Sequence, residues 1–196
     1  MNPTIDRREA IKRTALLMGA AVSASAITGV LNRCKPTPEL LYTPVFFTPE
    51  QARIIIEVAE IIIPKTDTPG AKDAGVPGFI DTMLKDCYKK EDQDRFLAGL
   101  NAFDEEAKKS YGDRFIYCKP EQQTELVKKV HDEALQEMRE NKEAKRPFIL
   151  MTKELTLLGF FTSEPGATQV LQYIAVPGSY KGCIPISEAG NGKAWA

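Results

Sequence analysis

Side chains that bind soft metals are scarce in this 196-residue sequence, which contains a single histidine and four cysteines. The cysteines are Cys34, Cys87, Cys118 and Cys183. No two of them are separated by two residues, as they are in many zinc and haem-attachment motifs. The sequence therefore predicts neither a zinc site nor a haem site.

Acidic residues do not form a recognisable calcium loop either. Asp67, Asp73 and Asp81 surround a Pro-Gly segment. Their spacing lacks the alternating ligands and the terminal glutamate of an EF-hand. We interpret these three residues as turn-forming and helix-capping residues.

Signatures of catalysis and of nucleic-acid binding are also missing. The sequence has no glycine-rich dinucleotide fingerprint and no phosphate-binding loop. Ser163 and Ser179 lack a nucleophile elbow, and Glu164 precedes a Pro-Gly pair that favours a helix start over a catalytic carboxylate. His131 falls in a charge-rich segment and is interpreted as a surface residue. The net charge of −1 leaves no basic footprint for nucleic acid.

The strongest positive signal is at the N-terminus, where Arg7 and Arg8 precede a modest apolar stretch over residues 14–31. This pattern indicates a twin-arginine export signal over residues 1–33. A membrane anchor is the alternative, but the stretch is short for a bilayer span and rich in small residues. Twin-arginine export carries folded proteins, so the chain either holds a cofactor inserted in the cytoplasm or travels with a partner that does.

The leader can be cleaved, lipidated or retained, and the sequence leaves these three alternatives open. Residues 24–26, Ala-Ser-Ala, satisfy the small-x-small rule for cleavage by signal peptidase. The second outcome is lipidation at Cys34, although Arg33 stands where a small residue is preferred. The third is retention of the leader as an uncleaved anchor. The domain is expected in the periplasm, and it is membrane-anchored in the second and third outcomes.

After the leader, the sequence predicts a proline-rich tether over residues 34–47 and one helical domain over residues 48–196. Apolar residues recur at helical spacing in five segments, and no period-two strand of useful length occurs. The segments cover residues 48–63, 76–88, 92–111, 120–138 and 147–161, and a short helix ends near residue 173. The predicted fold is all-α, a bundle of about five helices with long Pro/Gly-rich loops and an irregular C-terminal tail.

Several helix features can be predicted from single residues. Thr48, Pro49 and Gln51 form an N-cap, a first helical position and a capping box, and Gly112 is a natural helix end. The wide apolar face of the first domain helix predicts a central place in the core, whereas the Lys/Glu-rich face of residues 120–138 predicts an outer helix. Gly159 stands among bulky residues and suggests a close helix approach.

Two loops have the rigid, semi-apolar composition of a protein interface, namely residues 64–78 and 162–185. The alternative role for both is to seal the core of this domain. The candidate partner-interface residues are Pro64, Thr66, Asp67, Pro69, Gly70, Phe161, Glu164, Pro165, Gly166, Pro177 and Tyr180.

The role of Cys183 in the second loop is open. One interpretation is an internal disulfide with Cys87 or Cys118, and the other is a covalent tie to a partner chain. Cys87 and Cys118 are able instead to pair with each other, and the sequence alone does not decide the connectivity.

Several motifs together resemble the small-subunit family of gluconate 2-dehydrogenase (subunit 3). They are the twin-arginine leader, residues 62–71 (IIPKTDTPGA), 75–76 (GV), 79–81 (FID), 158–167 (LGFFTSEPGA) and 182–185 (GCIP). The resemblance covers most of the mature chain. The proline-rich tether and Cys34 depart from the better-known members of the family.

The resemblance implies a non-catalytic subunit that binds, helps to fold and escorts across the membrane a large dehydrogenase of the glucose-methanol-choline type. FAD is expected in that partner, which oxidises a sugar or sugar acid, and no cofactor is expected in this chain. In some such complexes a cytochrome subunit takes the electrons, and the twin-arginine translocase is a further partner. In related sugar dehydrogenases a cysteine in this region links the two subunits, and the corresponding residue is Cys183.

Two other functions compete with this one. The first is a stand-alone periplasmic enzyme, which a flavin spectrum or stoichiometric metal in the purified protein would indicate. The second is a lipid-anchored binding module, which a diacylglyceryl group on Cys34 would favour.

Overall fold

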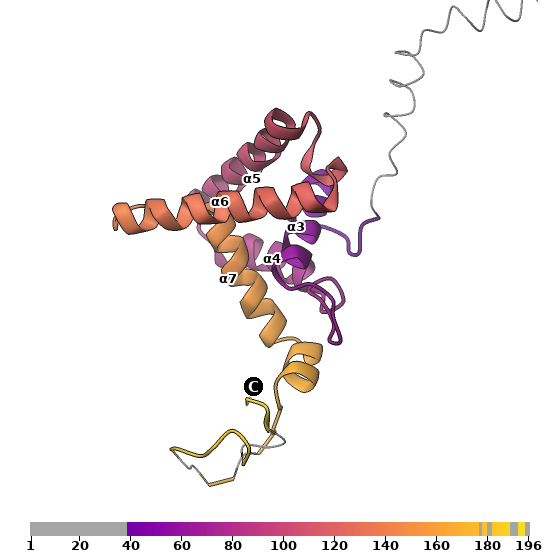
Figure 1. Ribbon diagram of the computed structural model, residues 1–196, viewed down its shortest axis with the longest axis vertical. Coiled ribbons are helices and arrows are strands. Elements are labelled where there is room, and N and C mark those ends of the chain that lie inside the picture. The colour runs from indigo at the N-terminus through magenta and orange to yellow at the C-terminus, as the bar shows by residue number, and fades with distance from the viewer. Residues whose placement is uncertain (1–38, 177, 180–181, 189–191, 195–196) are drawn as a thin grey trace, which may run out of the picture. The chain divides into compact units, whose positions relative to one another are not determined.

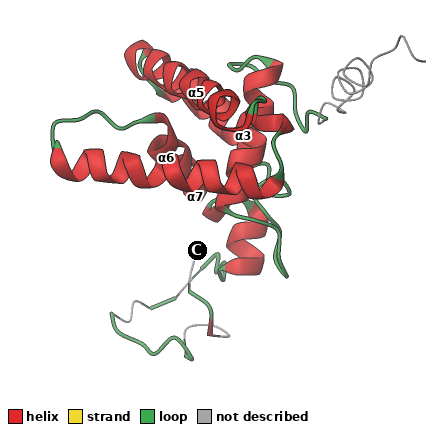
Figure 2. Ribbon diagram, turned by 45° about the horizontal axis from the view of Figure 1, so that its top comes forward, coloured by secondary structure: helices red, strands yellow, loops and turns green. Residues whose placement is uncertain are grey.

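The chain was analysed as a computed structural model, which describes residues 39–176, 178–179, 182–188 and 192–194 (Figure 1). Within these ranges the secondary structure is helical and contains no sheet (Figure 2). The helices are α3 (Pro49–Ile62), α4 (Val76–Cys87), α5 (Lys90–Tyr111), α6 (Pro120–Glu140), α7 (Phe148–Phe161), the short 3-10 helix η1 (Phe115–Tyr117) and the π-helix η2 (Gly166–Val170). The predicted all-α class is confirmed. No helix of the described part meets the length and apolarity needed to cross a membrane.

Local signals place most helix ends within two residues of where the sequence predicts them. The backbone N–H of Gln51 donates to Thr48 Oγ1, and the N–H of Thr48 donates to Gln51 Oε1, so the predicted capping box starts α3. Gly112 ends α5 with a φ of 77°, a left-handed conformation that glycine adopts without a steric penalty. The start of α5 lies at Lys90, two residues before the predicted start at Asp92.

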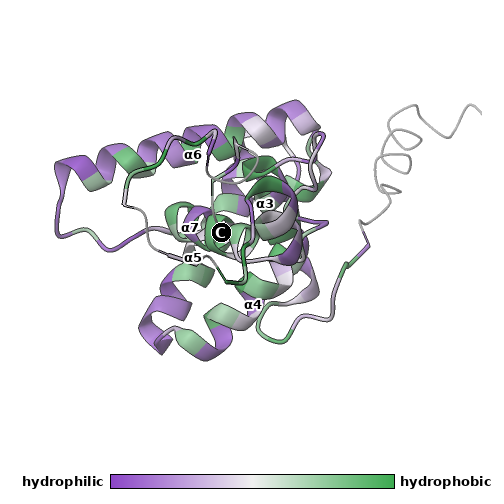
Figure 3. Cartoon of the chain, turned by 90° about the horizontal axis from the view of Figure 1, so that it is seen from below, coloured by the Kyte–Doolittle hydropathy of each residue, from purple (hydrophilic) through white to green (hydrophobic). Residues whose placement is uncertain are grey.

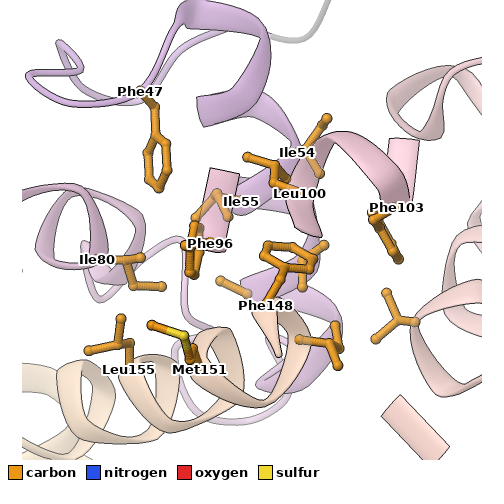
Figure 4. Close-up of a cluster of buried hydrophobic side chains, with 14 of the residues drawn as sticks. Phe47, Ile54, Ile55, Ile80, Phe96, Leu100, Phe103, Phe148, Met151 and Leu155 are labelled. Carbon is orange, nitrogen blue, oxygen red and sulfur yellow. The ribbon is translucent and has the colours of Figure 1, made fainter. Parts of the chain in front are cut away.

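Helix α7 is the centre of the bundle, because it contacts α3, α4, α5, α6 and η2. Its buried residues share one broad face of the helix: Phe148, Ile149, Met151, Thr152, Leu155, Thr156, Gly159 and Phe160. Figure 4 shows how Phe148, Met151 and Leu155 meet core side chains from α3, α4 and α5. Helix α3 is also deeply buried, but the central place that we predicted for α3 belongs to α7.

Two glycines allow the neighbouring helices to approach α7 closely. A Cβ atom on Gly159 would lie 2.6 Å from the ring of Phe79 on α4. A Cβ atom on Gly99 of α5 would lie 2.5 Å from the Cβ of Phe148 on α7. Both contacts are shorter than packed carbon atoms tolerate, so a side chain at either position would push two helices apart. The close approach predicted at Gly159 is confirmed.

Helix α6 is the outer helix that its charged face predicts. Only Leu126, Val127 and Ala134 are buried along its length. Figure 3 shows that most of α6 is hydrophilic, with separate hydrophobic bands along its length. The hydrophobic pattern of this segment therefore reported its orientation correctly.

Residues 40–47, here called the N-terminal strap, pack on the domain. We predicted that a tether extends to residue 47, but Leu40, Tyr42 and Phe46 lie against the core and Phe47 is buried within it. The compact helical unit correspondingly begins at residue 38. Residues 40–47 therefore pack with the helices, and the predicted domain start at residue 48 stays a prediction.

The strap is held by one buried carboxylate of α4. The Asp81 side chain is 1% exposed. Its Oδ2 accepts a hydrogen bond from the backbone N–H of Val45 (2.6 Å), and its Oδ1 accepts from the N–H of Phe46 (3.2 Å) and Phe47 (2.8 Å). These three bonds satisfy a buried charge with backbone donors, which is the arrangement that makes such burial tolerable.

Tyr42 shares the environment of Asp81. Burial of its ring, and secondly the negative charge of Asp81, raise the pKa of the Tyr42 phenol well above its ordinary value. The phenol oxygen is buried and makes no hydrogen bond within the described residues. Tyr42 therefore contributes to the strap through the packing of its ring, because its hydroxyl stays neutral and unpaired.

Asp81→Ala is predicted to lower the free energy of unfolding by about 3 kcal/mol, because it leaves buried N–H groups of the strap without an acceptor. Urea unfolding followed by circular dichroism measures this change. Asp86→Ala on the exposed face of the same helix is the matched control and should change the stability by less than about 0.5 kcal/mol. Equal effects of the two substitutions would show that Asp81 does not hold the strap.

Candidate functional site

The loop between α3 and α4, residues 63–75, is organised around the carboxylate of Glu60. Oε1 of Glu60 accepts a hydrogen bond from the backbone N–H of Lys65 (3.0 Å), and Oε2 accepts from the N–H of Lys72 (2.9 Å). The N–H of Ala71 donates to the carbonyl of Ile63 (2.9 Å), and Ala71 itself is fully buried. The loop is therefore tied back to the last turn of α3 along its whole length.

Gly70 lies directly over this carboxylate. A Cβ atom at this position would come within 2.5 Å of Glu60 Oε1 and 2.6 Å of the Lys65 nitrogen. Only glycine leaves room for the ring of hydrogen bonds that closes the loop. Gly70 consequently has a structural role in closing the loop. The sequence left open whether the loop that contains it forms an interface or seals the core.

Ion pairs add to the order of the α3–α4 loop. Lys72 contacts Glu57 at 2.9 Å, and Lys65 contacts Asp73 at 2.8 Å. The hydrogen bond between Lys65 and Asp73 raises the pKa of the lysine and lowers that of the carboxyl. Asp73 is thus part of a surface ion pair. No cluster of three potential metal ligands occurs among the described residues.

The predicted interface residues of this loop are not equally accessible. Pro64, Thr66 and Asp67 are exposed, Pro69 is half-buried, and Gly70 is buried. The loop therefore presents its first turn to solvent and seals the core with its second. The core-sealing role is thus observed for part of the segment, and the interface role of the exposed residues stays a prediction.

The second candidate segment follows α7 and is held by Ser163. The Ser163 hydroxyl donates to the carbonyl oxygen of Phe160 (2.6 Å) and accepts from the N–H of Gly166 (3.2 Å). A Cβ atom on Gly166 would lie 1.9 Å from that same carbonyl oxygen. The turn from α7 into η2 requires this serine and this glycine, which gives Ser163 a capping role. The Glu164 side chain is exposed and Pro165 is half-buried, in agreement with a helix start.

An exposed apolar surface remains at the C-terminal end of α7. Leu158 is 48% exposed and Phe161 is 39% exposed, and we call these two residues the α7 terminal patch. Farther along the chain, Tyr173 and Val176 are exposed as well. Sequence reasoning singled out Phe161 but missed Leu158, although Glu154, four residues before Leu158 and seven before Phe161, was an available signal of an outer face.

The two candidate segments lie at the same end of the domain. Figures 1 and 2 both show the α3–α4 loop beside the C-terminal half of α7. Helices α4 and α7 are in contact there through Phe79 and Gly159. The exposed first turn of the loop and the α7 terminal patch are thus parts of one end of the bundle. Pro177, Tyr180, Arg7, Arg8 and Cys34 lie outside the described residues.

None of the internal disulfides that we considered is formed among the described cysteines. Cys87 and Cys183 are exposed. The Cys118 thiol lies 3.4 Å from the carbonyl oxygen of Arg114, to which it donates a hydrogen bond. A link between Cys183 and a partner chain stays a prediction.

His131 differs from its predicted place on the surface. Its side chain is 18% exposed and lies between α6 and α7. Its Nε2 lies 2.9 Å from Lys153 Nζ, and its Nδ1 lies 3.2 Å from Asp132 Oδ1. His131 lies four residues after the buried Val127 and three residues before the buried Ala134. This helical spacing was the available signal that His131 faces the bundle.

A small helical domain with one rigid, partly apolar end is a structure suited to binding another protein. The model of the family described as gluconate 2-dehydrogenase subunit 3 matches residues 49–178, about two-thirds of the chain. The chain belongs to this family. Neither a curated protein nor a solved structure matches it.

Glu60→Gln is predicted to loosen the α3–α4 loop, because an amide accepts only one of the two backbone N–H groups and presents its own NH₂ to the other. Cleavage by trypsin after Lys65 and Lys72 should become at least about fivefold faster, since local opening exposes the backbone. Glu137→Gln, on the exposed face of α6, is the matched control and should leave the cleavage rate unchanged. An unchanged rate in Glu60→Gln would contradict the role of this carboxylate.

Proposed function

We propose that this chain is a non-catalytic accessory subunit that binds a large FAD-containing dehydrogenase, assists its folding and accompanies it through twin-arginine export. The observation that carries the proposal is the family match over residues 49–178, since the family is named for one subunit of a dehydrogenase. The partner is a sugar or sugar-acid dehydrogenase of the glucose-methanol-choline type, and a cytochrome subunit is a further member of the complex.

The surface at the end of α7 supports this proposal. Leu158 and Phe161 expose apolar area next to a loop whose backbone is held by Glu60. A surface that is already ordered loses little conformational entropy on binding, so more of the gain from apolar burial remains as affinity. A complex that crosses a membrane intact needs a large and rather apolar interface, of which the α7 terminal patch would form one part.

The N-terminal leader supports the same proposal, because it accounts for how the complex would be exported. A flavoprotein acquires FAD in the cytoplasm and must then cross the membrane folded, and Arg7 and Arg8 supply an address for folded cargo. The dehydrogenase needs no signal of its own if the complex survives translocation. The proposed location is the periplasm, with attachment to the membrane through the uncleaved leader or through a lipid on Cys34.

The proposal predicts that export of the dehydrogenase depends on this chain. A candidate dehydrogenase partner is expressed with the intact chain, without it, and with Arg7→Lys and Arg8→Lys together. Periplasmic activity and bound FAD should be present only with the intact chain, and the double variant should retain a cytoplasmic complex. Dehydrogenase with normal FAD in the periplasm of cells that lack this chain would refute the proposal.

The α7 terminal patch gives a second prediction. Leu158→Glu places a charge where the proposed interface is apolar, and it should weaken recovery of the dehydrogenase in pull-downs by about tenfold or more. The fold should persist because the side chain is already half in solvent. Leu41→Glu is the matched control, since Leu41 is 57% exposed on the strap and should leave recovery unchanged. Equal recovery with both variants would place the interface elsewhere.

A further inference from the structure

A groove between α6 and α7 is a feature that the proposed function does not use. It consists of two apolar hollows, of about 280 Å³ and about 310 Å³. The apolar residues of the first are Ile61, Ile62, Val127 and Ile149, and those of the second are Leu135, Met138, Leu150 and Leu157. We call this surface the α6–α7 groove. It contains neither residue of the α7 terminal patch.

His131 and Lys153 line both hollows and therefore mark the point where they meet. Lys153 Nζ donates a hydrogen bond to His131 Nε2 at 2.9 Å, which requires a neutral acceptor nitrogen. His131 Nδ1 then carries the proton and faces Asp132 Oδ1 at 3.2 Å. The middle of the groove thus contains Lys153, and its hydrogen-bond partner there, His131, is a base and not a counter-ion.

The charges along the groove are mostly positive, and two of them, Lys128 and Lys153, lack a counter-ion among the described residues. Lys128 lines the first hollow beside Lys153, and no described carboxylate lies within ion-pair distance of either lysine. The one acidic residue in the lining, Glu154, is paired with Arg146. An incoming carboxylate would provide the missing counter-ion for Lys153, because a partly buried cation gains from a charge-assisted hydrogen bond.

The spacing of these features has the period of an α-helix. On α6 the first hollow is centred near Val127 and the second near Leu135, with His131 one turn from each. The hollows are therefore about 12 Å apart at 1.5 Å per residue, which is close to the distance between positions i and i+7 or i+8 of a helix. A carboxylate at position i+3 or i+4 would then lie opposite Lys153.

We propose that the α6–α7 groove receives an amphipathic helix of a partner protein, with two apolar residues seven positions apart and an acidic residue between them. The apolar residues fill the two hollows, and the acidic residue pairs with Lys153. A fatty acid with its head at Lys153 would fill only one hollow, so the paired hollows favour a helical segment. This inference is independent of the dehydrogenase partnership.

The test uses the full-length chain and a labelled, stapled helical peptide of about 18 residues, long enough to span both hollows. The peptide carries two leucines seven positions apart and a glutamate four positions after the first, and the matched peptide carries lysine instead of glutamate. The acidic peptide should bind about tenfold more tightly by fluorescence anisotropy. Lys153→Glu should invert that preference, and Lys153→Met should remove it without adding a buried charge.

Lys89→Glu is the control variant, since Lys89 is exposed at the start of α5 and should leave both affinities unchanged. No binding of either peptide, or equal binding of the two, would overturn the proposal. Binding of decanoate in the absence of peptide binding would identify a site for a small carboxylate instead. If the chain self-associates and Lys153→Glu abolishes this self-association, a second copy of the chain is the occupant of the groove. This result also overturns the proposal.

Discussion

The packing of α7 is the constraint on which the rest of the structure depends. This helix is mostly apolar and buries one broad face, so its place in the fold depends on the elements that cover that face. Helices α4 and α5 reach it closely because Gly159 and Gly99 carry no side chain. The last turn of α7 extends beyond this cover, and Leu158 and Phe161 are exposed there. The same composition that builds the core therefore produces the apolar patch.

Loops of the domain are held by carboxylates that helices carry. Asp81 of α4 accepts the N–H groups of the strap, and Glu60 of α3 accepts those of the α3–α4 loop. Asp104 of α5 accepts the N–H of Phe115 and binds the guanidinium of Arg114, which also pairs with Glu50. Each carboxylate replaces solvent as the partner of otherwise unpaired backbone donors. Long loops without regular structure consequently have defined conformations.

This rigidity relates the fold to the proposed role. An escort subunit has to recognise a folded partner, and the affinity of such recognition falls when loops must become ordered on binding. The end of the bundle formed by α7 and the α3–α4 loop is ordered by internal hydrogen bonds. The α6–α7 groove lies along another part of α7 and has a different character, because it combines apolar hollows with lysines. The domain thus offers two chemically distinct surfaces to other proteins.

The sequence by itself determined the all-α class, the helix starts and stops, and the membership in the family. These features depend on signals between residues that are close along the chain, such as the capping box of Thr48 and Gln51 or the left-handed glycine at Gly112. The motif residues of the candidate interface were found in the same way, but their division into exposed and buried members was not.

Only the tertiary structure decided which helix is central, that the strap belongs to the domain, and that His131 lies between two helices. Each of these facts depends on residues far apart in the sequence. Asp81 meets the N–H groups of residues 45–47 across more than thirty positions, and His131 meets Lys153 across 22. Local propensity carries no information on such contacts, because they exist only once the helices have packed around α7.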